Sequence, residues 1–160
     1  MNNDITFERD ENVFNYRVAI VIKNNNRVLI QKDTRANHIT LPGGRCELGE
    51  SSADTAIREF IEETGIEAEN IKGLGMIENF FISSFNRKKY HEILLIQELK
   101  LKNSDEYNKI VINNIEKKKK EFLTYEWIEI NKLKESNFKP EIIIDMLNNN
   151  EFIHYINKEY

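Results

Sequence analysis

The chain has 160 residues, of which 40% are hydrophobic and 31% charged, and its formal net charge is −4. This length and composition are typical of one globular domain with one substantial core, so we expect a single domain over residues 1–160. The acidic balance argues against a protein that binds nucleic acid mainly through the phosphate backbone, because such binding needs a basic face. The one cysteine, Cys46, excludes an internal disulfide and indicates a reducing compartment.

The sequence gives no indication of a membrane or secretory protein. Residues 1–16 contain acidic and amide side chains and lack the basic start and apolar run of a secretory signal. No stretch approaches the roughly 20 apolar residues that a transmembrane helix needs. We therefore expect a cytoplasmic protein that does not associate with membranes.

The first regular elements predicted along the chain are strands. Residues 16–32 contain two β-branched, apolar runs separated by asparagines, which predicts a β-hairpin. A short β-prone segment over residues 38–48 follows, and the sequence Pro42-Gly43-Gly44 interrupts it.

A helix is predicted between Ser51 and Gly65. Ser51 and Asp54 have the spacing of a capping box, and Gly65 suits the left-handed conformation that commonly follows a helix. At about 100° per residue, the helix is expected to have one apolar and one acidic face. The apolar face would contain Ala53, Ala56, Ile57, Phe60, Ile61 and Thr64, and the acidic face Glu59, Glu62 and Glu63.

The rest of the chain predicts further strands and a last helix. Residues 71–84 and 88–101 have the pattern of a longer strand pair, and residues 122–130 that of one more strand. Between them, residues 102–120 are polar and lysine-rich, which favours an exposed loop. A C-terminal helix is predicted over residues 139–156. This order predicts an α/β fold in which helices cover a mixed sheet.

The acidic helix face has two interpretations. Like charges three and four residues apart repel by about 0.2–0.5 kcal/mol per exposed pair. Hard cations such as Mg²⁺ take oxygen ligands, and Glu59, Glu62 and Glu63 can present three carboxylates together. Acidic helix faces are also common as plain solvated surfaces, so the spacing alone leaves both interpretations open.

The residues around the acidic helix match a longer pattern. The pattern is Gly, five residues, Glu, seven residues, Arg-Glu, a bulky apolar residue, any residue, Glu-Glu, any residue, Gly and a bulky aliphatic residue. The matching positions are Gly44, Glu50, Arg58, Glu59, Phe60, Glu62, Glu63, Gly65 and Ile66. This stretch resembles the Nudix box at every fixed position. The resemblance implies a Nudix-type α/β/α sandwich with a mixed β-sheet, in general layout over residues 16–130.

The resemblance also implies roles for the box residues. Glu59 and Glu63 would be the principal metal ligands, and Glu62 a further ligand or the holder of metal-bound water. Arg58 would orient the carboxylates, and Glu50 would support the junction of loop and helix. The implied reaction is Mg²⁺-dependent hydrolysis of the diphosphate linkage in a nucleoside diphosphate derivative, with Mn²⁺ as a substitute ion.

The general base is left open between two candidates. Glu62 is one candidate. Glu121 is the other, because it follows the lysine run and precedes the late strand, and some relatives supply a base from the loop before such a strand. The weaker candidates are Glu116, Glu92 and Glu98.

The substrate is also open. A nucleoside triphosphate, a nucleotide sugar such as ADP-ribose, a dinucleoside polyphosphate and the triphosphate end of RNA all fit the implied chemistry. MutT-like relatives read an oxidised purine with an Asn near the last helix, and Asn137 lies near that place in a shifted register.

Two alternatives to a small-molecule hydrolase remain. One is a nucleotide-binding sensor with little turnover, in which box acids are usually lost. The other is an RNA 5′-end pyrophosphohydrolase, which only the lysine run at residues 117–120 supports. Many relatives are dimers, and the sequence marks no interface, so a homodimer is left open.

Overall fold

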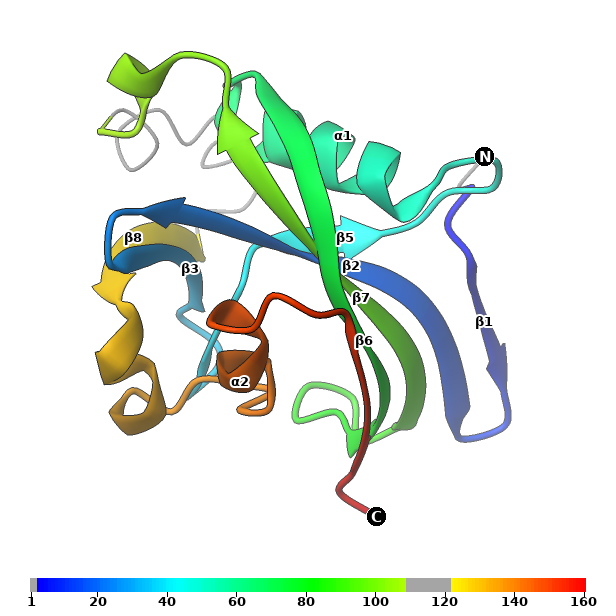
Figure 1. Cartoon of the computed structure of the whole chain (residues 1–160). Helices are drawn as coiled ribbons and strands as arrows, with labels where there is room; N and C mark the ends of the chain where they lie inside the picture. Colours follow the sequence, from blue (N-terminus) through cyan, green and yellow to red (C-terminus); the bar gives the residue numbers. More distant parts are fainter. Residues whose placement is uncertain (1–2, 109–121) are drawn as a thin grey trace.

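The computed structural model describes residues 3–108 and 122–160. Figure 1 shows a twisted sheet with helix α1 on one side and helix α2 on the other. In chain order the elements are β1 (Thr6–Arg9), β2 (Asn12–Asn24), β3 (Arg27–Asp33), β4 (Ile39–Thr40), β5 (Gly43–Arg45), α1 (Ser52–Thr64), β6 (Ala68–Ile82), β7 (Lys89–Leu101), η1 (Ser104–Glu106), β8 (Leu123–Glu129), η3 (Ile130–Glu135), α2 (Ile143–Leu147) and β9 (Ile153–Lys158).

The sheet is mixed, as the sequence predicted. Its main order is β4-β3-β2-β7-β6-β9, while β1 and β5 also pair with β2, and β8 pairs with β3. The β2–β7 and β6–β9 pairs are parallel, and the other pairs are antiparallel. The predicted α/β class with a mixed sheet is therefore confirmed.

Strand β2 connects the two halves of the sheet. Most of its length pairs with β7, from Asn12 opposite Lys89 to Ile22 opposite Leu99. Its last residues pair with the start of β3, which confirms the predicted hairpin. Beyond the hairpin, β3 turns away and pairs with β4 and β8. This divergence leaves room for a cavity between β2 and β3.

Alternate residues of β2 belong to two separate cores, because successive strand side chains point to opposite faces. On one face, Ile20 packs in a cluster with Ala56 and Phe60 of α1. On the other face, Val21 packs in a cluster with Ile77 of β6 and Met146 of α2. The sheet is thus covered on both sides.

Helix α1 has the predicted caps. Ser51 Oγ accepts a hydrogen bond from Asp54 N at 3.1 Å, and the Asp54 carboxylate accepts one from Ser51 N at 3.4 Å. Gly65 follows the helix with φ 69° and donates its N–H to Ile61 O at 2.7 Å. Among the described residues, no helix is long and apolar enough to cross a membrane.

The sequence prediction was wrong about which side of α1 two residues face. Ile61, expected on the packed face, is 40% exposed, whereas Glu63, expected on the acidic face, is 3% exposed. The helical repeat explains both differences. Seven residues along a helix rotate by about 20° less than two full turns, so Glu63 lies on almost the same side of the helix as buried Ala56. Ile61, five residues after Ala56, points to a different side.

The predicted C-terminal helix over residues 139–156 is wrong in its extent. Helix α2 contains only Ile143–Leu147, and three consecutive asparagines follow it. Ile153–Lys158 instead forms strand β9, which pairs in parallel with β6. The physical reason is that this segment alternates between half-buried and exposed residues, which suits the two faces of a strand.

We predict that Ser51→Ala lowers the free energy of unfolding by about 1 kcal/mol, because the first turn of α1 loses its side-chain acceptor. Urea denaturation of the variant measures this change. Ser84→Ala, at an exposed serine, is the matched control and should leave the midpoint unchanged. Equal midpoints for both variants would contradict the contribution of the cap.

Candidate active site

An ion pair between Arg58 and Glu50 joins helix α1 to the loop before it. Arg58 Nε donates to Glu50 Oε1 at 2.6 Å, and Arg58 Nη2 donates to Glu50 Oε2 at 2.9 Å. The same Nη2 donates to the carbonyl of Arg45 in β5 at 3.0 Å. Bidentate pairs of this kind fix orientation as well as distance. Arg58 therefore holds the loop and the strand against the helix.

Glu50 also accepts hydrogen bonds from the loop and from the start of α1. Its Oε2 atom also accepts hydrogen bonds from the Glu47 backbone N–H at 3.1 Å and from Thr55 Oγ1 at 2.9 Å. Hydrogen bonds from Arg58, with smaller contributions from Glu47 and Thr55, lower the pKa of Glu50 from 4.5 to about 2, against the opposing effect of burial. Glu50 is thus fixed as a carboxylate inside this network.

Glu59 lies directly against Gly44 of β5. A Cβ atom at position 44 would lie 2.0 Å from Glu59 Cδ, so only glycine leaves room for this carboxylate. Arg58 Nη1 donates to Glu59 Oε1 at 2.8 Å. Burial raises the pKa of Glu59, and the nearby charges of Arg58 and Arg17 oppose that rise. A partly desolvated carboxylate in this position is stabilised by positive charge.

The three carboxylates predicted as metal ligands differ in exposure. Glu63 is 3% exposed, whereas the side chains of Glu59 and Glu62 are 18% and 52% exposed. In the described part of the chain, no three Asp, Glu, His or Cys side chains converge as a ready metal site. Arg58 contacts Glu59 and also lies 3.6 Å from Glu62 Oε2. Arg58 is thus shared between Glu59 and Glu62.

The donor chemistry of this helix face nevertheless fits a hard divalent cation. All three side chains offer carboxylate oxygens, which Mg²⁺ prefers. The cradle at Gly44 and the burial of Glu63 place two of these carboxylates where water is scarce and positive charge is favourable.

The other candidate bases lie in different places. Glu121, Glu116 and the lysine run at 117–120 lie outside the described residues. Glu98 lies on β7 and pairs with Lys23 Nζ at 3.6 Å. Glu92, also on β7, lines a cavity on the face of the sheet opposite α1.

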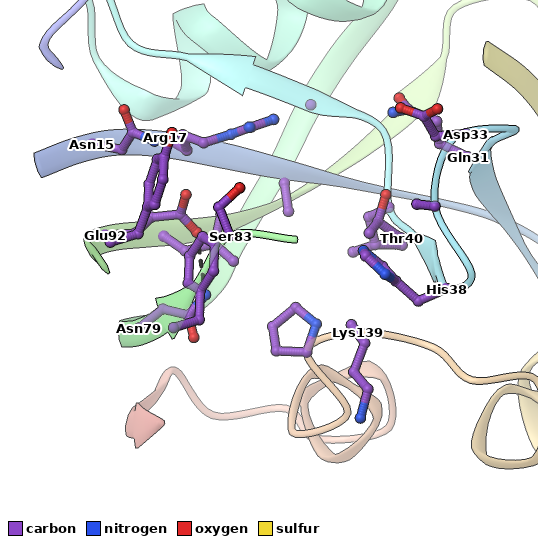
Figure 2. A pocket seen from close by; sticks show the side chains of 18 of the residues that line it. Asn15, Arg17, Gln31, Asp33, His38, Thr40, Asn79, Ser83, Glu92 and Lys139 are labelled. Atoms are coloured by element: carbon purple, nitrogen blue, oxygen red, sulfur yellow. Dashed lines mark hydrogen bonds between the residues drawn. The ribbon is translucent and has the colours of Figure 1, made fainter. Parts of the chain in front are cut away.

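This cavity has a volume of about 600 Å³ and lies between the β2-β7-β6 part of the sheet and the diverging strands β3 and β4. Figure 2 shows two walls. Asn15, Arg17, Glu92, Asn79 and Ser83 form one wall, and Gln31, Asp33, His38 and Thr40 form the other. Its size suits a nucleotide-sized ligand.

The cavity reaches the carboxylates of α1 through β5. Arg17 and Gly43 line it, and Arg17 is close enough for its charge to favour the charged form of Glu59 and so to oppose the rise in that residue's pKa. Gly43 is required here, because a Cβ atom would lie 2.0 Å from the carbonyl oxygen of Val18. A ligand in the cavity can therefore extend one end toward the acidic helix.

Asn137, near the place where MutT-like relatives carry a base-reading Asn, has a different contact. Its Nδ2 donates to the carbonyl of Asn37 at 2.7 Å. Its backbone is left-handed, with φ 52°. Among the described residues, Asn137 is not one of those that line the cavity.

Sequence reasoning missed Arg17 and most other polar residues of the cavity walls, although it named Glu92 as a weaker candidate for the general base. Their strands pair across long sequence separations, such as Arg17 beside Leu94 and Gln31 beside Tyr125. A polar residue in an alternating strand usually marks the solvent face. The one signal available was that Arg17 interrupts an otherwise apolar run.

The fold and the box geometry agree with the comparisons with known proteins. The model of the NUDIX domain matches residues 13–146, so the chain belongs to the NUDIX domain family. Among solved structures, a MutT protein from Bacillus halodurans aligns with a TM-score of 0.63 and 19% identity, covering 89% of this chain and 90% of that one. A NUDIX hydrolase from Nitrosomonas europaea aligns with a TM-score of 0.62 and 17% identity, covering 91% and 79%.

The curated relatives match over shorter stretches. A protein of Lactococcus lactis subsp. cremoris named "Probable DHNTP pyrophosphohydrolase" is 38% identical over 78 residues, which is 47% of this chain and 46% of that protein. The alignments span 23 to 46% of the length of the curated relatives. These partial alignments agree with the family match and do not show a shared activity.

We predict that Glu50→Gln removes a pH-dependent part of the stability. Because the folded-state pKa is lower than the unfolded one, the native state binds fewer protons between about pH 4.5 and about pH 2, and stability falls as the pH decreases. The contribution is about 3 kcal/mol and is complete above the unfolded pKa.

Urea denaturation of wild type and Glu50→Gln from pH 7 to pH 3 measures this effect. The stability difference between the two proteins should shrink as the pH falls below about 4.5. A difference that stays constant over this range would contradict the role of Arg58 in holding Glu50 charged.

Proposed function

We propose that the protein is a Mg²⁺-dependent hydrolase that cleaves the diphosphate linkage of a nucleoside diphosphate derivative. The observation that carries this proposal is the position of the cavity, which runs from the sheet face to Arg17 and Gly43, beside the carboxylates of α1. A substrate bound there has its phosphates at the box residues.

Glu59, Glu62 and Glu63 would hold the metal, and Mn²⁺ could substitute for Mg²⁺. A bound divalent cation would neutralise phosphate oxygens and lower the pKa of a bound water. Support comes from the oxygen donors, the cradle at Gly44 and the burial of Glu63.

The chain's own residues position the reacting groups. Glu50 orients Arg58, and Arg58 in turn holds Glu59 against β5. Arg17 attracts the anionic phosphates into the cavity. Glu62 would be the general base, since its 52% exposed side chain has access to water, and Glu121 is the alternative base.

The substrate belongs to the small-molecule nucleotides on this proposal. The names of two similar proteins mention such compounds: DHNTP for the Lactococcus lactis relative, and ADP-ribose for a pyrophosphatase of Streptococcus suis with a TM-score of 0.51. A nucleotide-binding sensor is the less supported candidate, because every box acid is present.

The test is release of phosphate or pyrophosphate from a panel of nucleoside triphosphates, nucleotide sugars, dinucleoside polyphosphates and 5′-triphosphate RNA. Each reaction is run with Mg²⁺, with Mn²⁺ and with EDTA. Turnover of a small nucleotide that EDTA abolishes would support the proposal. A folded protein that binds nucleotides but turns over none would favour a sensor, and turnover of RNA alone would favour the RNA candidate.

We predict that Glu63→Gln lowers kcat at least about 100-fold, because the shape of the side chain is kept while a metal-binding charge is lost. The measurement is steady-state turnover of the best panel substrate, with the thermal midpoint as a check on folding. Glu129→Gln removes a carboxylate from the exposed end of β8 and should retain full activity. Full Mg²⁺-dependent turnover in Glu63→Gln would contradict the role of Glu63.

A further inference from the structure

A row of polar side chains crosses the cavity face of the sheet. Asn15 of β2 pairs with Glu92 of β7, Glu92 pairs with Asn79 of β6, and Asn79 pairs with Asn157 of β9. Neighbours in one register row share a face. Asn15, Glu92 and Asn79 are only 2%, 6% and 6% exposed. Burying polar side chains costs free energy unless they are hydrogen bonded. Any member of the row with unused hydrogen-bonding capacity is therefore a candidate for contact with a ligand.

The hydrogen bonds of the row fix the two amides beside Glu92. Asn157 Nδ2 donates to Asn79 Oδ1 at 2.8 Å, and Asn79 Nδ2 donates to Glu92 Oε1 at 3.3 Å. On the other side, Asn15 Oδ1 accepts a hydrogen bond from Thr6 Oγ1 at 2.8 Å. The amide of Asn79 is therefore oriented by Asn157 so that its N–H group faces Glu92.

Glu92 has acceptor capacity left for a ligand. An ionised carboxylate has about four lone-pair sites. Among the described side chains, only Asn79 donates to Glu92, at a distance beyond the usual range for N–H···O bonds. Glu92 also lines the cavity, where Figure 2 places it beside Asn15 and Asn79. A buried carboxylate in this state suits a ligand with two adjacent N–H donors.

We propose that Glu92 determines substrate specificity by binding the 2-amino-4-oxopyrimidine edge, which guanine and pterins share. The inference rests on the proposed hydrolase function and names the substrate class for the same site. This edge presents a ring N–H beside an amino group, two parallel donors for two carboxylate oxygens. Adenine and cytosine present a donor beside an acceptor, and hypoxanthine lacks the amino group.

The neighbours of Glu92 along the strands place the rest of the substrate. Phe81 and Tyr90 are paired across β6 and β7 one repeat away, and their rings stack with centroids 5.1 Å apart. Both line the cavity and offer apolar surface to a planar base. In the other direction, Arg17 lies one repeat beyond Asn15, about 7 Å along β2. Arg17, where the phosphates are proposed to bind, therefore lies on the same face of the sheet as Asn15 and farther from Phe81 and Tyr90.

A carboxylate can also bind the two hydroxyl groups of a ribose, which would give no preference among bases. A test at constant ribose and phosphate separates the two cases. We would measure the binding of GMP, IMP and AMP by calorimetry in EDTA, so that neither metal nor turnover is needed. We expect GMP to bind about 10- to 100-fold more tightly than IMP or AMP, as expected when a hydrogen bond to a charged group is lost.

Glu92→Gln tests the assignment directly. A glutamine offers one acceptor and one donor, so it should lose the preference for GMP and should bind AMP better relative to GMP than the wild type does. Glu78→Gln, which removes a carboxylate from the neighbouring position on the opposite face of β6, is the control and should keep the GMP preference. Equal binding of the three nucleotides by the wild type, or binding of none, would overturn the proposal, whether or not the variant folds.

Two further comparisons distinguish a guanine ligand from a pterin ligand, and the specificity of Glu92 from the proposed hydrolase function. Guanosine against neopterin shows whether the natural edge is that of guanine or of a pterin, and binding of either one in preference to adenosine supports the proposal. Hydrolysis in the panel without a guanine or pterin preference would overturn this inference and leave the proposed function standing. A clear preference for guanine or pterin without hydrolysis of any substrate would support this inference and overturn the proposed hydrolase function.

Discussion

The bidentate pair of Arg58 and Glu50 is the interaction on which the site depends. It joins the residue before the helix cap to the middle of α1, and through the Arg45 carbonyl it also fixes β5. With β5 in place, Gly44 forms the floor under Glu59. The pair is partly buried, and its bidentate geometry fixes the orientation of both side chains. Its consequence is that the carboxylate face of the helix is oriented before any ligand arrives.

Strand β2 connects β5 to the cavity. The same strand carries Val18 and Ala19, which pair with Gly44 and Gly43, and Asn15 and Arg17, which line the cavity. Because alternate residues point to opposite faces, one strand contacts both α1 and the ligand space. The bend of β3 away from β2 after the hairpin then opens the space between the two walls.

Much of the fold was predictable because its signals are local. The caps at Ser51 and Gly65, the hairpin and the spacing of the box depend on neighbouring residues, and each is present in the structure. The strand at Ile153–Lys158 was missed because its pairing partner, residues 75–80 of β6, lies far away in the sequence. The strand at Thr6–Arg9 was missed although it pairs with the adjacent residues 12–15. Long-range pairing also explains why the cavity was not predicted. Glu92 was named only as a weaker candidate base, and no local pattern shows that it is a neighbour of Asn15. The family resemblance indicated the acidic helix as the candidate site, whereas the cavity wall with Asn15, Glu92 and Asn79 follows only from the pairing of strands that are distant in sequence.

On the proposed function, the charges of Arg17 and Glu92 would favour one direction of a bound nucleotide along β2. Arg35 is engaged by Asp33 through two hydrogen bonds and lies over the ring of Phe122, so its charge is largely compensated within the far wall. Arg17 lies at the end nearest the acidic helix, whereas Glu92 lies one repeat away from it along the sheet. A phosphate chain is attracted by Arg17 and repelled by Glu92, and the reverse holds for a base that donates hydrogen bonds. Reversed binding would bring a phosphate next to the carboxylate of Glu92, and these like charges repel. On the proposed function, the separation of Arg17 from Glu92 would therefore direct the diphosphate toward the carboxylates of α1.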